Sequence, residues 1–225
     1  MKTVVITGVS RGIGRATANK FLSEGWRVIG TSTSGQADYS HENLEVVQLD
    51  FLDSISIKSA SEKIASLSPR IDALVNNAGV ALDSWDEGVD MLKVRKTFEI
   101  NLFGLIELTE NLLPNITNGG RIVNLTSRYG SFSMPIDDNT SIGYRMAKAS
   151  LNMYTRFLAF RLADHQIIVS AIHPGWTKTD MGFDGSTDEA KPDREPEEPA
   201  REIFDLATLD IESGQFWENG QKRDW

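Results

Sequence analysis

Residues 3–14 read Thr3-Val-Val-Ile-Thr-Gly-Val-Ser-Arg-Gly-Ile-Gly14, and they set the architecture of the whole chain. The apolar run 3–7 predicts a buried strand, and the glycine-rich turn after it leads into a helix predicted at 15–24. A tight glycine turn lets the backbone approach a pyrophosphate, while the helix N-terminus offers free N–H groups and a positive dipole end. Glycines also form ordinary turns, but a strand before and a helix after favour a phosphate-binding turn.

Strand-like and helix-like segments alternate along the rest of the chain. Further strands are predicted at 26–30, 44–49, 71–75, 121–126, 167–172 and 215–217, and helices at 56–67, 89–113, 144–163 and 203–209. Seven strands separated by helices predict one doubly wound α/β domain of Rossmann type, residues 1–225, with a mostly parallel sheet. Residues 180–201 are rich in Gly, Pro, Asp and Glu, which indicates either a substrate loop or lid, or a solvated surface loop.

The composition argues against several classes of function. A net charge of −9 disfavours a general nucleic-acid binder, because such proteins concentrate Lys and Arg against phosphates. With no cysteine, disulfides and thiolate chemistry are excluded, and the three histidines lack metal-ligand spacing, so no metal site is expected. No apolar run is long enough to span a membrane, and the first strand leaves no room for a signal peptide, so we expect a cytoplasmic protein without membrane partners.

Several motifs resemble those of the short-chain dehydrogenase/reductase family, in that family's order. The glycine turn has its T-G-x-x-x-G-x-G spacing, residues 76–79 resemble its N-N-A-G motif, and residues 174–179 resemble its P-G-x-x-x-T segment. The resemblance implies hydride transfer between a nicotinamide cofactor and a small carbonyl or alcohol substrate, with the catalytic residues Asn101, Ser127, Tyr144 and Lys148. Residues 144–148, 173–182 and 213–225 are similar to the C-factor (C-signal) branch, some of whose members have signalling roles.

The resemblance also assigns residues to the cofactor. The expected contacts come from Gly8, Ser10, Arg11, Gly12, Ile13, Gly14, Thr31, Ser32, Asp50, Phe51, Asn77, Ala78, Gly79, Tyr144, Lys148, Pro174, Gly175, Thr177 and Thr179.

Tyr144 and Lys148 are four residues apart on a predicted helix and therefore project from one face. A phenol with a pKa of about 10 is a poor catalyst at neutral pH, but a nearby ammonium favours the phenolate. Tyr144 is thus a candidate general acid or base, although the same spacing is common in surface pairs. Ser127 follows the end of a strand, where its hydroxyl can donate to a substrate carbonyl or cap a turn.

Asn101 falls inside the long predicted helix, where asparagine is disfavoured. The resemblance implies a helix distortion that binds water and extends a proton relay to Lys148; the alternative is an exposed helical Asn. The 17-residue separation of Ser127 and Tyr144 is longer than the family usually has, which predicts an extra loop at 132–140 beside the site.

The end of the second strand bears on the choice of cofactor. An NAD site usually has an acidic residue there for the ribose 2′-hydroxyl, but residues 30–34 contain none. Arg11 in the glycine turn can reach a 2′-phosphate, so we expect NADP(H), with NAD(H) as the alternative and Asp38 as its possible ribose ligand. Candidate substrate contacts, which could equally be packing residues, are Trp85, Arg128, Met134, Trp176 and Met181.

The predicted helix 144–163 carries two apolar stripes. Ala147, Leu151, Tyr154 and Leu158 suit the core, while the second stripe is Met146, Met153, Phe157 and Phe160. We expect the second stripe to form a homodimer or homotetramer interface, with Met153 and Phe157 near the axis, unless it packs on the preceding helix. An alternative to the enzyme is a cofactor-binding regulatory or signalling protein with little turnover.

Overall fold

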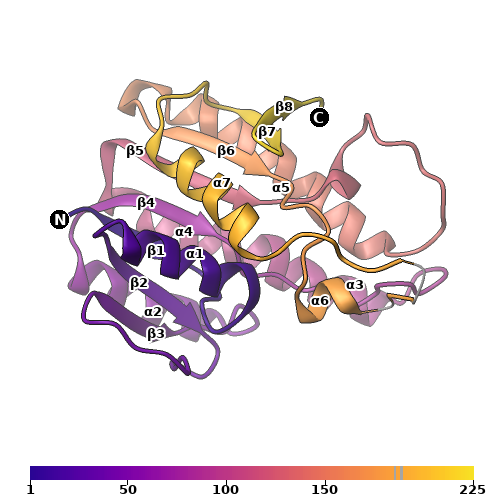
Figure 1. Cartoon of the computed structure of the whole chain (residues 1–225), viewed down its shortest axis with the longest axis horizontal. Helices are drawn as coiled ribbons and strands as arrows, with labels where there is room; N and C mark the ends of the chain where they lie inside the picture. Colours follow the sequence, from indigo (N-terminus) through magenta and orange to yellow (C-terminus); the bar gives the residue numbers. More distant parts are fainter. Residues whose placement is uncertain (185, 188–189) are drawn as a thin grey trace.

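A twisted β-sheet runs through the centre of the computed structural model, which describes residues 1–184, 186–187 and 190–225 (Figure 1). Its strand order is β3-β2-β1-β4-β5-β6-β7-β8, and only β8 is antiparallel to its neighbour. The order reverses between β1 and β4, and such a switch point is where open α/β sheets bind ligands. The strands are β1 Thr3–Ile6, β2 Arg27–Ser32, β3 Leu44–Gln48, β4 Ile71–Asn76, β5 Ile116–Leu125, β6 Ile168–Ile172, β7 Gln215–Glu218 and β8 Gln221–Arg223.

Helices cover both faces of the sheet, with α1 and α7 on one side and α2, α4 and α5 on the other (Figure 1). Side chains alternate along β1, so Val4 and Ile6 pack under α1 and α7 while Val5 faces the other layer. The helices are α1 Gly12–Ser23, α2 Ser54–Leu67, α3 Met91–Phe98, the π-helical η1 Glu99–Phe103, α4 Gly104–Leu112, η2 Leu113–Asn115, η3 Arg128–Gly130, α5 Ile142–Arg161, η4 Ala163–His165, α6 Asp180–Phe183 and α7 Glu197–Thr208.

This architecture confirms the predicted α/β domain with a mostly parallel sheet, and it corrects some details. The eighth strand was not predicted, because Gln221–Arg223 is exposed and carries no apolar pattern. The predicted helix 89–113 is interrupted by the wider π-helical turn η1 around Asn101, and this confirms the helix distortion that the resemblance implied there. The last helix begins at Glu197 instead of residue 203, since a proline followed by two glutamates suits a helical first turn as well as a loop.

The predicted lid, residues 180–201, is described only in part. Gly185, Asp188 and Glu189 lie outside the described residues. The described remainder contains α6 and the start of α7, so this segment is not one continuous loop. Whether it acts as a lid stays a prediction.

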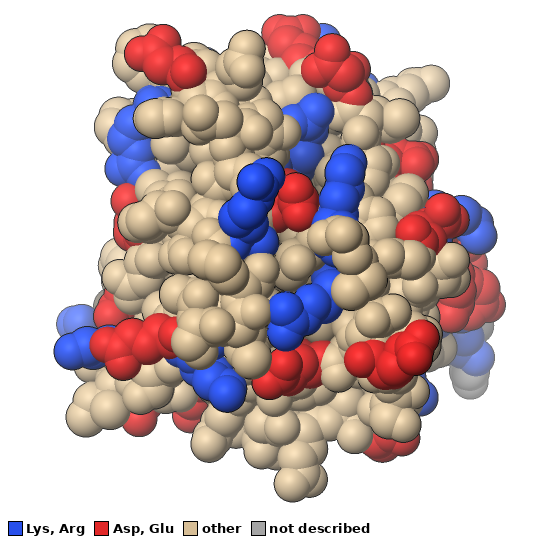
Figure 2. Space-filling view, turned by 90° about the vertical axis from the view of Figure 1, so that its left-hand side faces the viewer, with Lys and Arg blue, Asp and Glu red and all other residues tan. Residues whose placement is uncertain are grey.

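The surface bears on possible partners. Basic and acidic side chains are interspersed over the face in Figure 2, without a large area of one sign. Within the described part of the chain, no helix is long and apolar enough to cross a membrane. Met146, Met153, Phe157 and Phe160 are all exposed by 49% or more, so the described part of the chain leaves much of the second stripe of α5 uncovered.

Candidate functional site

The glycine turn is locked against the loop that follows β4. Gly8 and Gly12 have φ of 75° and 56°, a region that glycine enters without steric cost, and a Cβ at Gly14 would collide with the Gly8 carbonyl oxygen. The Asn77 amide donates to the carbonyl oxygen of Thr7 at 2.7 Å, while the Thr7 hydroxyl accepts from the Asn77 N–H at 3.0 Å. These contacts join two sequence motifs at the switch point of the sheet.

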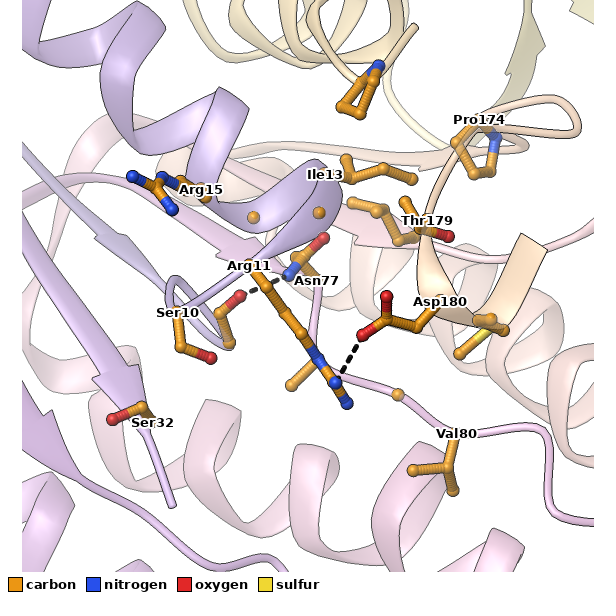
Figure 3. A pocket seen from close by; sticks show the side chains of 18 of the residues that line it. Ser10, Arg11, Ile13, Arg15, Ser32, Asn77, Val80, Pro174, Thr179 and Asp180 are labelled. Atoms are coloured by element: carbon orange, nitrogen blue, oxygen red, sulfur yellow. Dashed lines mark hydrogen bonds and ion pairs between the residues drawn. The ribbon is translucent and has the colours of Figure 1, made fainter. Parts of the chain in front are cut away.

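A cleft of about 600 Å³ opens at the carboxyl ends of the parallel strands (Figure 3). Gly175 and Thr177 do not line it. The Arg194 side chain lies against Gly175, and the Thr177 side chain is buried, with its hydroxyl donating to the Pro174 carbonyl oxygen at 3.1 Å. All other predicted cofactor residues are found in its wall: Gly8, Ser10, Arg11, Gly12, Ile13, Gly14, Thr31, Ser32, Asp50, Phe51, Asn77, Ala78, Gly79, Tyr144, Lys148, Pro174 and Thr179.

The cleft suits a dinucleotide. Among the residues that the structure describes, no side chain caps the N-terminus of α1, so the first N–H groups of this helix are available to an anion. The backbone between Gly8 and Gly14 forms a cradle that side chains at its glycines would fill. The pyrophosphate of a dinucleotide binds where the backbone can approach it closely and where N–H donors are free.

Tyr144 and Lys148, both on α5, line one part of the cleft. The Lys148 ammonium is 5.6 Å from the centroid of the Tyr144 ring and donates to the Leu125 carbonyl oxygen at 2.8 Å. Ser127 is buried next to Tyr144 but does not line the cleft. Its hydroxyl accepts from the Tyr129 N–H, so Ser127 caps a turn, as the alternative expected.

The ionisation of this pair differs from the expectation. Burial raises the pKa of Tyr144 to about 12, an effect that the Ser127 hydroxyl offsets only in part. Burial also lowers the pKa of Lys148 to about 8. The net shift of the Tyr144 pKa is therefore upward, opposite to the expected lowering, because desolvation dominates for both groups.

Asn101 is fully buried in η1, which rules out the exposed alternative. Its amide oxygen accepts from the Val80 N–H at 2.8 Å, and its amide nitrogen donates to the Val80 carbonyl oxygen at 2.7 Å. A Cβ at Gly79 would lie 3.2 Å from the Asn101 amide oxygen and 3.6 Å from the Lys148 ammonium. Gly79 thus allows the loop after β4, the π-helical turn and α5 to converge.

Asp83 is a site residue that the sequence did not single out. Its carboxylate is 2% exposed and accepts from the N–H groups of Gly143, at 2.5 Å, and of Tyr144, at 3.2 Å. Ser141, which precedes α5, is left-handed and supplies no side-chain cap, so Asp83 caps the helix in its place. In the sequence Asp83 is one of several acids in a polar stretch, and only its burial distinguishes it.

The candidate substrate residues lie in different places. Met181 lines the cleft, whereas Arg128 and Met134 do not. Trp85 and Trp176 are also outside its wall; their indole N–H groups donate to the carbonyl oxygens of Asp184 and Gly182. The predicted loop 132–140 is mostly exposed and pairs with the loop before α3 through a single bridge between Glu87 and Thr140.

Charged side chains at the cofactor end are largely paired. The Arg11 guanidinium contacts the Asp180 carboxylate at 2.5 Å across the cleft (Figure 3). Arg15 pairs with Asp38 at 3.0 Å and lies over the ring of Tyr39. Asp38 does not line the cleft, so the structure does not bring this alternative ribose ligand to it.

Comparisons with known proteins identify relatives of this chain in both sequence and structure. The family described as short chain dehydrogenase matches residues 2–190. A 3-oxoacyl-[acyl-carrier-protein] reductase of Aquifex aeolicus is 36% identical over 191 residues, which cover 80% of this chain and 75% of the relative. The C-signal protein of Myxococcus xanthus is 37% identical over 121 residues, 52% of this chain and 72% of the relative. The NADPH-bound carbonyl reductase from chicken fatty liver is 27% identical with a TM-score of 0.86, covering 100% of this chain and 99% of the other.

Proposed function

Because the chain belongs to the short-chain dehydrogenase family, whose members are oxidoreductases that transfer a hydride, we propose that it interconverts a carbonyl compound and an alcohol with NADP(H). The observation that carries this proposal is the convergence of Lys148 and Asn101 on Gly79, with Tyr144 in the wall of the same cleft, which suits a dinucleotide. The chain has the machinery for proton transfer and the cradle for the cofactor in one cavity.

In this proposal the two halves of the cleft divide the binding of the cofactor. The glycine turn and the N-terminus of α1 hold the pyrophosphate, and Asp50 lies at the adenine side. Residues 77–79, with Pro174 and Thr179, enclose the nicotinamide side. When bound, the cofactor supplies the hydride for reduction or accepts it in oxidation.

Proton transfer falls to the residues of the chain. In reduction, the Tyr144 hydroxyl gives its proton to the carbonyl oxygen; a pKa of about 12 keeps this acid protonated at neutral pH. The Ser127 hydroxyl donates a hydrogen bond to the same oxygen as negative charge develops. The Lys148 ammonium, 5.6 Å from the Tyr144 ring centroid, stabilises the phenolate that remains. Asn101 fixes the Val80 backbone beside them.

Three observations support NADP(H) over NAD(H). The cleft wall at the end of β2 offers Thr31 and Ser32 and no carboxylate, Asp38 is paired with Arg15, and Arg11 lies in the glycine turn. A solved relative, the chicken carbonyl reductase, is described as NADPH bound. NAD(H) remains the alternative cofactor.

A second candidate, a cofactor-binding signalling protein, has the similarity to C-signal in its favour. It is the weaker candidate, because a protein without turnover has no chemical need for a buried lysine beside a tyrosine and a serine.

The test is a panel of aldehydes and ketones followed by NADPH absorbance, with the wild type and two tyrosine variants. Tyr144→Phe should lower kcat by about 10²-fold or more, the usual worth of a general acid, while NADPH still binds. Tyr154→Phe is the matched control, because Tyr154 is on the same helix but its hydroxyl donates to Glu110. A wild-type rate for Tyr144→Phe would exclude it as the acid, and NADPH binding without turnover on any substrate would favour the signalling protein.

A further inference from the structure

The ion pair between Arg11 and Asp180 joins the two walls of the cofactor cleft (Figure 3). Arg11 precedes α1 on the glycine-turn side, and Asp180 is the first residue of α6 on the opposite side. Both side chains line the cleft, and they are 78% and 74% exposed. An ion pair this exposed adds little to folding stability, so another anion can replace the carboxylate at small cost.

Asp180 is the fixed member of the pair. The Thr179 hydroxyl caps α6 by accepting from the Gly182 N–H at 3.1 Å. The Trp176 indole donates to the Gly182 carbonyl oxygen at 2.7 Å, and the Trp85 indole donates to that of Asp184 at 2.8 Å. Since α6 is held from two separate loops, the long side chain of Arg11 is the part that can turn.

Arg11 is also the cation best placed to be free for a phosphate. Four basic side chains line the cleft among the described residues: Arg11, Arg15, Lys148 and Lys178. Lys148 is buried at the catalytic end, and Lys178 pairs with Glu195 at 2.5 Å. Arg15 is held by Asp38 and by stacking on Tyr39. Across the part of the chain that the structure describes, the Arg11 guanidinium has Asp180 as its one partner.

We propose that Asp180 is a cofactor-selectivity residue, which competes with the 2′-phosphate of NADP(H) for Arg11. This inference rests on the proposed use of NADP(H). Binding of NADP(H) then requires the Arg11–Asp180 pair to open, whereas NAD(H), without a 2′-phosphate, leaves it closed. Asp180 therefore weakens the binding of NADP(H). It also reduces the preference for NADP(H) over NAD(H) that Arg11 creates.

Direct binding measurements at low ionic strength test the proposal without any turnover. Asp180→Asn should tighten the binding of NADPH by about 1.5- to 5-fold, the range for one exposed ion pair, and leave NADH nearly unchanged. Asp180→Asn should also tighten the binding of the fragment 2′,5′-ADP, which carries the 2′-phosphate. It should leave the binding of 5′-AMP, which lacks that phosphate, nearly unchanged. The gain should shrink at high salt, because exposed charges are screened.

Two further sets of variants separate competition from a general charge effect. Glu197→Gln removes another carboxylate from the cleft wall, one with no contact to Arg11, and should not change the ratio of NADPH to NADH affinity. In an Arg11→Ala background, Asp180→Asn should lose its effect on NADPH.

The outcomes distinguish the inference from its premise. If the wild type binds NADH at least as tightly as NADPH, the proposed NADP(H) preference is wrong, and the inference with it. If Arg11→Ala leaves the ratio of NADPH to NADH affinity unchanged, Arg11 does not bind the 2′-phosphate, and the inference fails while the preference stands. If Arg11→Ala lowers the ratio but Asp180→Asn acts equally on both cofactors, or acts without Arg11, then only the role of Asp180 is overturned.

Discussion

At the scale of single residues, His173 is the clearest case of a buried titratable group outside the proposed chemistry. It ends the buried run of β6, is 9% exposed, and its Nδ1 atom has no partner in the described part of the chain. Burial, followed by the charges of Arg128, Arg223 and Arg194, lowers its pKa to about 3. The Glu218 carboxylate is 3.6 Å away and is itself paired with Arg223, so His173 stays neutral.

His173 should therefore make the fold sensitive to acid. Below the unfolded pKa of about 6.5 the unfolded chain binds a proton that the folded chain does not accept until pH approaches 3. The unfolding free energy should fall by about 2 kcal/mol between pH 7 and pH 5 from this residue alone. Denaturant titrations at pH 7 and pH 5 measure this fall in the unfolding free energy. In His173→Gln the fall should be smaller by about this amount, whereas in His41→Gln, a change at an exposed histidine, it should be as large as in the wild type. Equal losses in the wild type and His173→Gln would refute the assignment.

Sequence reasoning predicted which side chains come together at the cleft, Tyr144 and Lys148 among them, but not their ionisation. The spacing of Tyr144 and Lys148 follows from helix geometry, which is local. Their pKa values follow from burial, which depends on segments far away in the sequence, such as the end of β5 at Leu125. The expected cleft positions of Gly175 and Thr177 failed for a similar reason, because the turn after β6 folds back on itself.

At the scale of elements, α5 carries the proposed proton donor, and its start is held by the loop after β4. The Asp83 carboxylate accepts from the backbone of Gly143 and Tyr144, 60 residues further along the chain. A carboxylate at a helix N-terminus is stabilised by the helix dipole as well as by the hydrogen bonds.

Asp83→Ala should lower the unfolding free energy by about 1–2 kcal/mol, as for the loss of a strong cap, and should also lower kcat because Tyr144 loses its support. Asp83→Asn keeps one acceptor oxygen and should recover part of the unfolding free energy and part of kcat. The matched control is Asp53→Ala, which removes the cap of α2 at a residue that lies outside the cleft wall and has no hydrogen bond to α5 in the described part of the chain, so it should lower stability without lowering kcat. Measuring kcat and denaturant stability together decides: if Asp83→Ala unfolds more easily at an unchanged kcat, Asp83 does not position Tyr144.

Elements were predictable where the pattern is local and strong. The apolar run predicted β1 to within one residue, whereas α1 begins at Gly12, three residues before its predicted start. The π-helical turn at Asn101 could be suspected from an asparagine inside a helix, but its extent is set by the backbone of Val80. The cap by Asp83 could not be predicted, since nothing in sequence links two residues that only the sheet brings together.

At the scale of the whole molecule, one face of α5 is left without a cover. Phe157 and Met153 are 58% and 59% exposed, while Leu151 and Leu158 on the opposite face are buried. Phe103 at the end of η1 adds to the exposed apolar area. A patch of this kind is typical of a two-fold interface, in which each copy covers the other.

We therefore expect a homodimer that contains α5 at its interface. Light scattering should give at least twice the chain mass of 25.0 kDa at micromolar concentration. Phe157→Glu should shift the mass to that of one chain, because the carboxylate would be buried without a partner. Phe132→Glu, on the exposed loop 132–140, should leave it unchanged. A wild-type mass of 25 kDa across micromolar concentrations would rule the dimer out.

The short strand β8 has a consequence for behaviour at high concentration. It forms the last edge of the sheet, beyond β7, and its three residues, Gln221, Lys222 and Arg223, are all exposed. An uncovered strand edge invites another chain to add to the sheet, and charged side chains on that edge oppose this. β7 and β8 form an antiparallel hairpin, so the polar strand β8 covers the more apolar β7 at this edge. The polar edge protects the protein against edge-to-edge aggregation.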